Sequence, residues 1–293
     1  MQNNMTGANG CFAALGCFDG LHIGHREVIT CPDGENRKRT VLSIASNPEA
    51  RRLMQRDRWL STLRDWGAQE VIEPPFSEIK DMTPREFVED FLGTKLHAGH
   101  VSCGYNFRFG KNANGDAELL SRLCEESGMK CTVVPEVDFG SCSVSSTEIR
   151  RCLTLGETER ANAMLGRRFG WSLTVVHGNA LGHTLGTPTI NQVFPDDLFL
   201  PKFGVYASET VIDGVKRYGV TNVGVKPTVG SPCPLGETWI PEFSGDLYGR
   251  EVEVGLISFI RPEEKFENLD LLREAIHRDA EKSKEVFRRT FGE

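Results

Sequence analysis

The hydrophobic pattern changes near residue 170, and this change constrains the fold more than any other feature of the chain. Before it, short apolar runs alternate with segments that have helical spacing. Strands separated by helices predict a parallel sheet with helices on both faces. After it, most apolar runs are β-rich and several alternate, which predicts an antiparallel sheet closed into a barrel. A length of 293 residues is enough for about two such domains.

The first half yields a definite order of expected elements. Strands are expected at 11–15, 41–45, 70–73, 101–103 and 131–135, and helices at 24–30, 60–66, 84–96 and 117–127. The helix at 84–96 carries one apolar stripe, formed by Phe87, Val88, Phe91 and Leu92.

The second half contains a hairpin signal and ends in a helix. Asp213-Gly214 separates two β-rich runs, which is typical of a tight hairpin turn. The closing helix is expected at 268–290, with an apolar face made of Leu272, Ala275, Ile276, Ala280 and Phe287. The boundary between the halves is expected within 156–172, where a short helix ends at Gly166. We therefore expect domains at 1–160 and 161–293.

Composition excludes several classes of protein. A hydrophobic fraction of 39% with 26% charged residues is ordinary for a globular chain and excludes a disordered chain, a collagen or a coiled coil. No apolar run approaches the ~20 residues of a membrane helix, and the polar N-terminus does not resemble a secretory signal. Nine cysteines without a CxxC pair favour reduced thiols in the cytoplasm. A net charge of −7 argues against nucleic acid as the main partner.

The strongest local signal is the segment 16–25, GCFDGLHIGH, which follows an apolar strand and opens a helix. The N–H groups at the start of a helix attract phosphate, and His22 and His25 fall on one side of its first turn. The glycines allow the backbone to approach a ligand closely. The alternative is a strand–turn–helix with a capping aspartate and two surface histidines.

Three further segments of the first half are less specific. In 104–110, GYNFRFG, the side chains of Asn106 and Arg108 follow a strand and could reach a nucleotide, or the loop could be the edge of the core. In 145–151, SSTEIRR, Ser145 and Glu148 form a capping box, and Arg150 could instead face a phosphate. The letters HAGH at 97–100 repeat part of the first motif without a glycine turn before them, and we expect a loop there.

The second half offers a glycine-rich segment and an acidic strand. The glycines of 178–191, GNALGHTLGTPTIN, could form a flap over phosphates or a simple hairpin. Thr189 and Asn191 are two residues apart, so on a strand they share a face and offer oxygen ligands suited to Mg²⁺. Glu237 could be a general base for an alcohol, or an exposed strand residue. Glu242 is the next candidate for that role.

Taken in order, these motifs identify a resemblance to a known family. The chain resembles the prokaryotic bifunctional riboflavin kinase/FAD synthetases over about residues 11–290. The motifs that carry this resemblance are, in order, GCFDGLHIGH, GYNFRFG, SSTEIRR, LGRRF, GHTLGTPTIN, GVYAS, GVTNVGVKPTVG, ETW and DLYGR. The resemblance implies an α/β nucleotidyltransferase-type (Rossmann-like) domain followed by a six-stranded riboflavin kinase barrel. It also implies phosphorylation of riboflavin to FMN by ATP, and then adenylylation of FMN to FAD with release of pyrophosphate.

The resemblance also implies roles for individual residues, with Mg²⁺ as cofactor and ATP, riboflavin and FMN as substrates. In the first domain, His22 and His25 would stabilise the ATP phosphates in the transition state. The other ATP-binding residues there would be Gly16, Phe18, Asp19, Gly24, Asn106, Ser146, Thr147 and Arg150. In the barrel, ATP would be bound by Gly182, Thr184, Gly186, Pro188, Thr189 and Asn191. Thr189 and Asn191 would also hold Mg²⁺, and Glu237 would be the base toward the riboflavin hydroxyl.

The chain departs from the family pattern at a few positions. The family usually has Phe-Asp-Pro-His-Pro after its second strand, whereas this chain has Ile-Ala-Ser-Asn-Pro at 44–48, so Asn47 stands in place of a histidine. Trp239 and Thr187 replace a frequent histidine and a frequent phenylalanine in the barrel. Two alternatives to the bifunctional enzyme follow. One is a riboflavin kinase with a degenerate first domain, and the other is a non-catalytic regulator that binds flavin or nucleotide.

Overall fold

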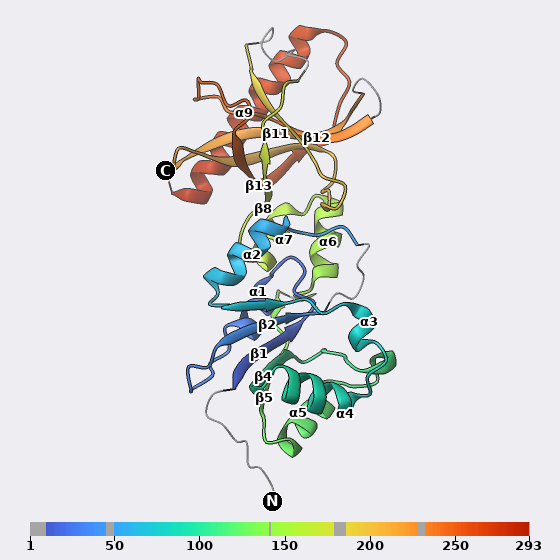
Figure 1. Cartoon of the computed structure of the whole chain (residues 1–293). Helices are drawn as coiled ribbons and strands as arrows, with labels where there is room; N and C mark the ends of the chain where they lie inside the picture. Colours follow the sequence, from blue (N-terminus) through green and yellow to red (C-terminus); the bar gives the residue numbers. More distant parts are fainter. Residues whose placement is uncertain (1–9, 45–49, 141, 179–185, 228–231, 293) are drawn as a thin grey trace, which may run out of the picture. The chain divides into compact units, whose positions relative to one another are not determined.

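A computed structural model describes residues 10–44, 50–140, 142–178, 186–227 and 232–292. The chain forms two compact units (Figure 1). The first comprises Met1–Ala50 and Arg56–Ser145, and the second comprises Arg51–Gln55 and Ser146–Glu293. Each unit has its own sheet and its own core, and each is described separately below.

The first unit contains a five-stranded parallel sheet in the order β3-β2-β1-β4-β5. Its strands are β1 Cys11–Gly16, β2 Arg39–Ser43, β3 Glu70–Ile72, β4 Ala98–Gly104 and β5 Lys130–Val134. The chain builds outward from β1 in one direction and then returns to add β4 on its other side. The predicted parallel α/β architecture is therefore confirmed, with the direction of strand addition reversing between β1 and β4.

Helices cover both faces of this sheet (Figure 1). On one face, the Ser102 hydroxyl of β4 donates to the carbonyl of Val28 in α1 at 2.8 Å. On the other, Cys103 packs in a core with Phe87 and Leu120. The helices are α1 Ile23–Ile29, α2 Arg56–Asp65, α3 Phe76–Ile79, α4 Pro84–Glu86, the π-helix η1 Phe87–Lys95, the short 3₁₀ helix η2 Lys111–Ala113 and α5 Ala117–Glu126. All four residues of the predicted stripe in 84–96 are buried.

The loop expected at 97–100 is wrong, because His100 lies within β4 and is fully buried. Its Nδ1 lies 3.0 Å from an Asp33 carboxylate oxygen, and its Nε2 lies 2.8 Å from the Thr132 hydroxyl. Burial lowers the pKa of His100, so the neutral ring is favoured and serves as a polar link inside the sheet.

The first unit also contains a two-stranded ribbon that the sequence patterns do not predict. It pairs β6 Asp138–Phe139 with β7 Cys142–Ser143.

The second unit contains a six-stranded antiparallel sheet in the order β8-β13-β10-β11-β12-β9. Its strands are β8 Phe169–Thr174, β9 Thr189–Val193, β10 Gly204–Ile212, β11 Val215–Pro227, β12 Pro232–Trp239 and β13 Glu251–Arg261. The hairpin predicted at Asp213-Gly214 joins β10 to β11, and both turn residues have positive φ, 51° and 75°. This is the conformation that the tight hairpin turn requires.

Polar contacts join the two ends of this sheet. The Val176 N–H, just after β8, donates to the carbonyl of Asn191 in β9 at 2.8 Å. Inside the sheet, the fully buried Gln192 amide donates to the carbonyls of Leu173 and Val252, both at 2.7 Å. Its oxygen accepts from the Trp171 indole N–H at 2.9 Å. Gln192 therefore ties β9 to β8 and β13, and the antiparallel barrel architecture is confirmed.

Among the described residues, the second unit also contains the helices α6 Ser146–Leu155, α7 Thr158–Leu165 and α9 Leu269–Phe291. As predicted, α7 ends at Gly166, which has a left-handed φ of 69°. The long helix α9 packs Ala280 and Phe287 against the outer face of the barrel, and its Ala275 is also buried. The same face of α9 also buries polar groups, since the Ser283 hydroxyl donates to the Gly219 carbonyl at 2.6 Å.

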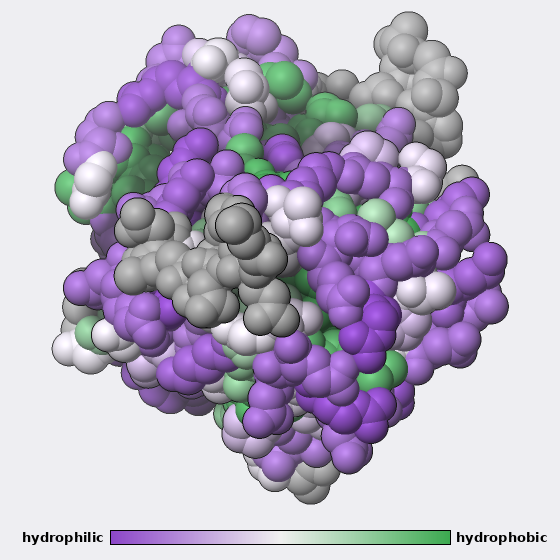
Figure 2. Space-filling model, turned by 60° about the horizontal axis from the view of Figure 1, so that its bottom comes forward, coloured by the Kyte–Doolittle hydropathy of each residue, from purple (hydrophilic) through white to green (hydrophobic). Residues whose placement is uncertain are grey.

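The surface seen in Figure 2 is mostly hydrophilic, with small scattered hydrophobic areas. Within the described part of the chain, no helix is both long and apolar enough to cross a membrane. This agrees with the absence of a long apolar run in the sequence.

We expect Gln192→Leu to destabilise the barrel by about 2–4 kcal/mol, because it leaves three buried polar groups without their partner. Hydrogen exchange of the β8 and β9 amides measures this locally, and both strands should exchange faster than in the parent. The matched control is Gln69→Leu, because Gln69 is exposed and accepts a single backbone N–H. Parental exchange rates in β9 of Gln192→Leu would contradict the assigned role.

Candidate active sites

A strained turn joins β1 to α1 in the first unit. Phe18, Gly20 and Leu21 have positive φ values of 51°, 76° and 44°, and two of these residues are not glycine. Two donors from neighbouring elements hold the turn. The Trp59 indole N–H donates to the Phe18 carbonyl at 2.9 Å, and the Ser43 hydroxyl donates to the Cys17 carbonyl at 3.0 Å. Backbone strain held in this way is common at ligand-binding sites.

The two predicted histidines meet at the start of α1. His22 precedes the helix, and its Nδ1 accepts the backbone N–H of His25 at 3.2 Å. The two rings stack with centroids 3.5 Å apart and planes inclined by 20°. The Phe18 ring packs edge-on against His25 at 5.3 Å. The His22 imidazole thus accepts a hydrogen bond at Nδ1, which in the neutral ring leaves Nε2 as the protonated nitrogen.

This turn lies at the point where ligands bind in sheets of this type. In an open parallel sheet, ligands bind at the carboxyl ends of the strands, where the strand order reverses. Here that point lies between β1 and β4. Gly16 ends β1 and is followed by the histidine turn, whereas β4 ends at Gly104 and is followed by the exposed Asn106. The topology therefore brings these two sequence motifs to one edge of the sheet.

Three of the residues predicted to bind the first nucleotide lie in the second unit. Ser146, Thr147 and Arg150 belong to the first turns of α6. The Arg150 guanidinium donates to the Arg51 carbonyl at 2.8 Å and lies 5.6 Å over the ring of Phe199. Its position is therefore set by packing and by a backbone acceptor within this unit.

In the barrel, the strand register brings together the predicted catalytic residues. Glu237 of β12 is paired directly with Asn191 of β9, and Trp239 is paired with Thr189. Side chains directly opposite in antiparallel strands lie on one face, with Cβ atoms about 4.5–5.5 Å apart. The spacing of two residues in each strand keeps all four side chains on that face. A carboxylate, an amide and a hydroxyl thus share one surface of the barrel.

This surface is the outer face, next to α9. Trp239 packs with Val205, Val220 and Ala280, and its ring lies edge-on to His277 of α9 at 5.3 Å. Beyond this apolar contact, the face continues along β12 to Glu237. The Asn191 side chain is only 8% exposed. The apolar contact with α9 therefore borders a row of polar side chains on the same face.

Gly178 allows the backbone after β8 to approach Asn191 closely. A Cβ at Gly178 would lie 2.5 Å from the Asn191 Nδ2 and 2.8 Å from its Oδ1, which is closer than any side chain tolerates. The amide nitrogen also lies 3.4 Å from the Thr189 carbonyl. The Asn191 amide is thus confined by neighbouring backbone on two sides.

Parts of the predicted site lie outside the described residues, namely Gly182, Thr184 and the segment 45–49 that contains Asn47. Gly186 and Pro188 are described and exposed, and Thr187 between them is buried. The described residues contain no group of three or more histidine, cysteine or acidic side chains able to hold a metal ion.

The alternative base, Glu242, is engaged elsewhere. Its carboxylate pairs with Lys284 of α9 at 2.9 Å and accepts from the Tyr218 hydroxyl at 3.4 Å. The ammonium of Lys284 lowers the pKa of Glu242, and burial raises the pKa of Tyr218. Glu242 is therefore part of the contact between the sheet and α9.

Two polar residues near the site are not indicated by any sequence motif. Asn222 is paired with Glu237 on the side away from Asn191, and Gln192 lies in the interior of the barrel.

Comparison with known proteins matches both units. Residues 5–148 match the FAD synthetase family model, and residues 165–287 match the riboflavin kinase model. A bifunctional riboflavin kinase/FMN adenylyltransferase of Listeria monocytogenes is 31% identical over 94% of this chain and 91% of its own. The protein of the same description from Escherichia coli K12 is 33% identical over 95% and 93%.

The chain belongs to the bifunctional riboflavin kinase/FMN adenylyltransferase family. The fold agrees with a crystal structure described as a macrolide-efflux protein from Streptococcus pneumoniae, with a TM-score of 0.85 and 26% identity over 96% of both chains. The parallel unit is thus the FAD synthetase domain, and the barrel is the riboflavin kinase domain.

We expect Gly178→Ala to reduce riboflavin phosphorylation about ten- to hundredfold, because the new methyl group displaces the Asn191 amide. FMN adenylylation should be unchanged, since the histidines predicted for that reaction lie in the first unit. Chromatography of the flavins formed from riboflavin, and separately from FMN, distinguishes the two effects. Phosphorylation at the parental rate would show that the position of Asn191 is unimportant.

Proposed function

We propose that Glu237, Thr189 and Asn191 carry the kinase reaction of this family, and that His22 and His25 carry the adenylyl transfer. The chain is a bifunctional enzyme that phosphorylates riboflavin to FMN and adenylylates FMN to FAD. The observation that carries the proposal is the pairing of Glu237 with Asn191 across β12 and β9. This pairing sets a base beside a nucleotide-binding amide on one face of the barrel.

In the kinase reaction, Glu237 accepts the proton of the riboflavin 5′-hydroxyl as its oxygen attacks the γ-phosphorus of ATP. The bond from that phosphorus to the bridging oxygen breaks, and ADP leaves. Thr189 and Asn191 orient the phosphates, together with Gly182, Thr184, Gly186 and Pro188. Most of the catalysis in such a transfer comes from positioning and electrostatics.

The donor set on this face fits Mg²⁺. The Thr189 hydroxyl and the Asn191 carbonyl oxygen are hard, neutral ligands, and Mg²⁺ commonly takes only one or two protein ligands alongside water and phosphate oxygens. The lack of a larger acidic or cysteine cluster among the described residues is compatible with an ion that arrives with ATP. When bound, Mg²⁺ neutralises charge on the ATP phosphates.

In the adenylyl transfer, a phosphate oxygen of FMN attacks the α-phosphorus of ATP, and pyrophosphate leaves. The nucleophile is already an anion, so no base is needed. His22 and His25 donate to the ATP phosphates as charge develops. The proposed ATP-binding residues are Gly16, Phe18, Asp19, Gly24, Asn106, Ser146, Thr147 and Arg150.

We also propose functional domains at 1–160 and 161–293, supported by the family matches that end at 148 and begin at 165. The partners are the small molecules ATP, riboflavin and FMN, and the net charge of −7 supports the absence of a nucleic acid partner. All nine cysteines are free thiols, which supports a cytoplasmic location.

We expect Glu237→Gln to reduce riboflavin phosphorylation by roughly 10²–10⁴-fold, because glutamine keeps the shape but cannot accept the proton. Steady-state formation of FMN from riboflavin, ATP and Mg²⁺ measures this. Glu242→Gln is the matched control and should remain close to the parent, because Glu242 pairs with Lys284. A parental rate for Glu237→Gln would remove Glu237 from the role of base.

We expect His25→Ala to abolish most FAD formation from FMN, whereas Asn47→His should leave it unchanged or raise it. A histidine at 47 can carry a charge toward the triphosphate, which asparagine cannot, and a charged donor is worth about tenfold in rate. Release of pyrophosphate from FMN and ATP is the measurement, and His97→Ala, at an exposed histidine, is the control. If the parent forms no more FAD than His25→Ala, the chain is a kinase with an inactive first domain.

A further inference from the structure

The carboxylate of Glu237 has a second polar neighbour, on the side away from Asn191. Asn222 of β11 is paired directly with Glu237 of β12. The two side chains therefore lie on the same face, as Asn191 and Glu237 do. Asn222 is half-buried. Three adjacent strands thus present a row of amide, carboxylate and amide, with Glu237 at its centre.

The orientation of the Asn222 amide is fixed by Glu263. Its Nδ2 donates to a Glu263 carboxylate oxygen at 3.2 Å. A carboxylate only accepts hydrogen bonds, so it holds the NH₂ group of the amide and not its carbonyl. One N–H is used in this bond, and the second can be donated to the neighbouring Glu237. A donor on this side would fix the orientation of the carboxylate, and a general base must be held within hydrogen-bond reach of the proton that it takes.

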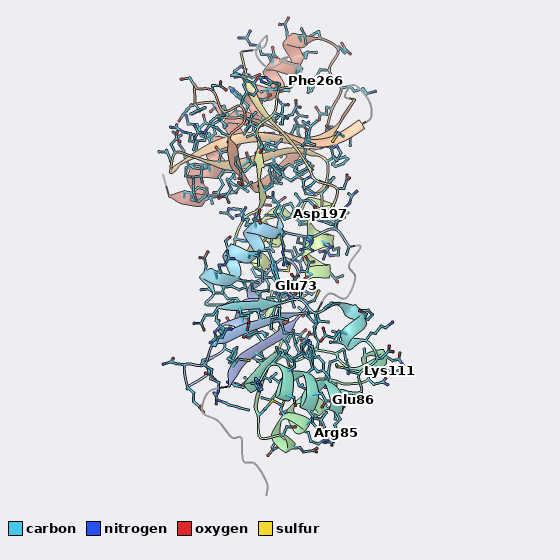
Figure 3. All side chains as sticks on the ribbon, viewed as in Figure 1. Glu73, Arg85, Glu86, Lys111, Asp197 and Phe266 are labelled. Atoms are coloured by element: carbon cyan, nitrogen blue, oxygen red, sulfur yellow. The ribbon has the colours of Figure 1, made fainter. Side chains whose placement is uncertain are left out.

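Glu263 is held in place by the connector between β13 and α9. The connector begins at Arg261, whose guanidinium pairs with the buried Asp279 at 2.8 and 3.0 Å and lies 5.5 Å over the Phe266 ring. Phe266 of this connector is labelled in Figure 3. It ends at Asn268, which caps α9 by accepting the Leu271 N–H at 2.9 Å. With both ends fixed, the connector presents Glu263 to β11.

The strand leaves room for this carboxylate. Gly224 lies two residues beyond Asn222 on the same face of β11. A Cβ at Gly224 would overlap the Glu263 carboxylate. Gly224 and the Asn222 amide together define the position of the Glu263 carboxylate. An alanine at 224 would displace this carboxylate without changing any polar group.

We propose that Asn222 is a positioning residue for Glu237 in the kinase reaction, and that Glu263 sets the orientation of Asn222. This rests on the proposed role of Glu237 as the base. Asn222 acts on the hydroxyl of the substrate only through Glu237, so its loss lowers kcat and leaves substrate binding unchanged.

The test is steady-state riboflavin phosphorylation with a titration of riboflavin binding by quenching of flavin fluorescence. Asn222→Ala should lower kcat about tenfold, with the KM values for riboflavin and ATP and the riboflavin Kd within about twofold of the parent. Glu263→Ala and Gly224→Ala should give a smaller loss of the same kind. Glu263→Gln should keep the parental kcat, because the amide oxygen of the glutamine still accepts a hydrogen bond from Asn222. Glu267→Ala, on the same connector, is the control and should match the parent.

Coupling between the residues separates this proposal from the proposed function. In the Glu237→Gln background, Asn222→Ala should have no further effect on kcat, since its action is through the carboxylate. A full additional loss in that background, or a rise in the riboflavin KM or Kd instead of a fall in kcat, overturns the positioning role. Equal losses from Glu263→Gln and Glu263→Ala overturn the role of Glu263. A parental rate for Glu237→Gln alone overturns the assignment of the base and the positioning role together.

FAD formation from FMN by each variant checks folding of the first unit, and hydrogen exchange of β11 and β12 checks the barrel. Exchange at parental rates with a lowered kcat supports positioning. The proposal is overturned if the amides of Gly224→Ala or Asn222→Ala exchange faster and Glu263→Gln has a lowered kcat. These residues would then stabilise the barrel and would not position Glu237.

Discussion

The proposed catalytic face of the barrel depends on the register of three antiparallel strands. Pairing of β9, β12 and β11 aligns Asn191, Glu237 and Asn222 across one face. A slip of one residue in any of these strands would turn that strand's member of the row to the interior of the barrel, because side chains alternate between faces. The interior resists such a slip, since the Gln192 amide binds carbonyls of β8 and β13 and the Trp171 indole. A buried hydrogen-bond network in the interior thus helps to fix the position of Glu237, the proposed base.

The first unit uses a different constraint to the same end. Its site is set by topology, because the strand order reverses between β1 and β4, so the loops after both strands reach one edge of the sheet. The strained turn after β1 is fixed by donors from Trp59 and Ser43, and the His22 and His25 rings stack at 3.5 Å. The candidate site of the barrel is thus positioned by strand register, whereas that of the parallel sheet is positioned by the ends of strands.

Much of the fold could be predicted because local patterns were consistent with it. The stripe at 84–96, the hairpin at Asp213-Gly214 and the end of α7 at Gly166 all occur as expected. Predictions were wrong where contacts with residues distant in the sequence determine the local structure. His100 was expected in a loop, yet it lies in β4 with partners at Asp33 and Thr132. Those partners are 67 and 32 residues away in the chain, and no local pattern signals them.

The sequence by itself determined the two architectures, the family and the identity of the candidate catalytic groups, because these follow from periodicity and from motifs that lie close together in the chain. Only the tertiary structure decided which strand neighbours Glu237. Asn222 and Glu237 are adjacent through strand pairing, and Glu263 joins them through a connector anchored by Arg261 and Asp279. The physical reason is that strand pairing and burial bring together residues that are far apart in the chain. Local sequence patterns do not indicate such contacts.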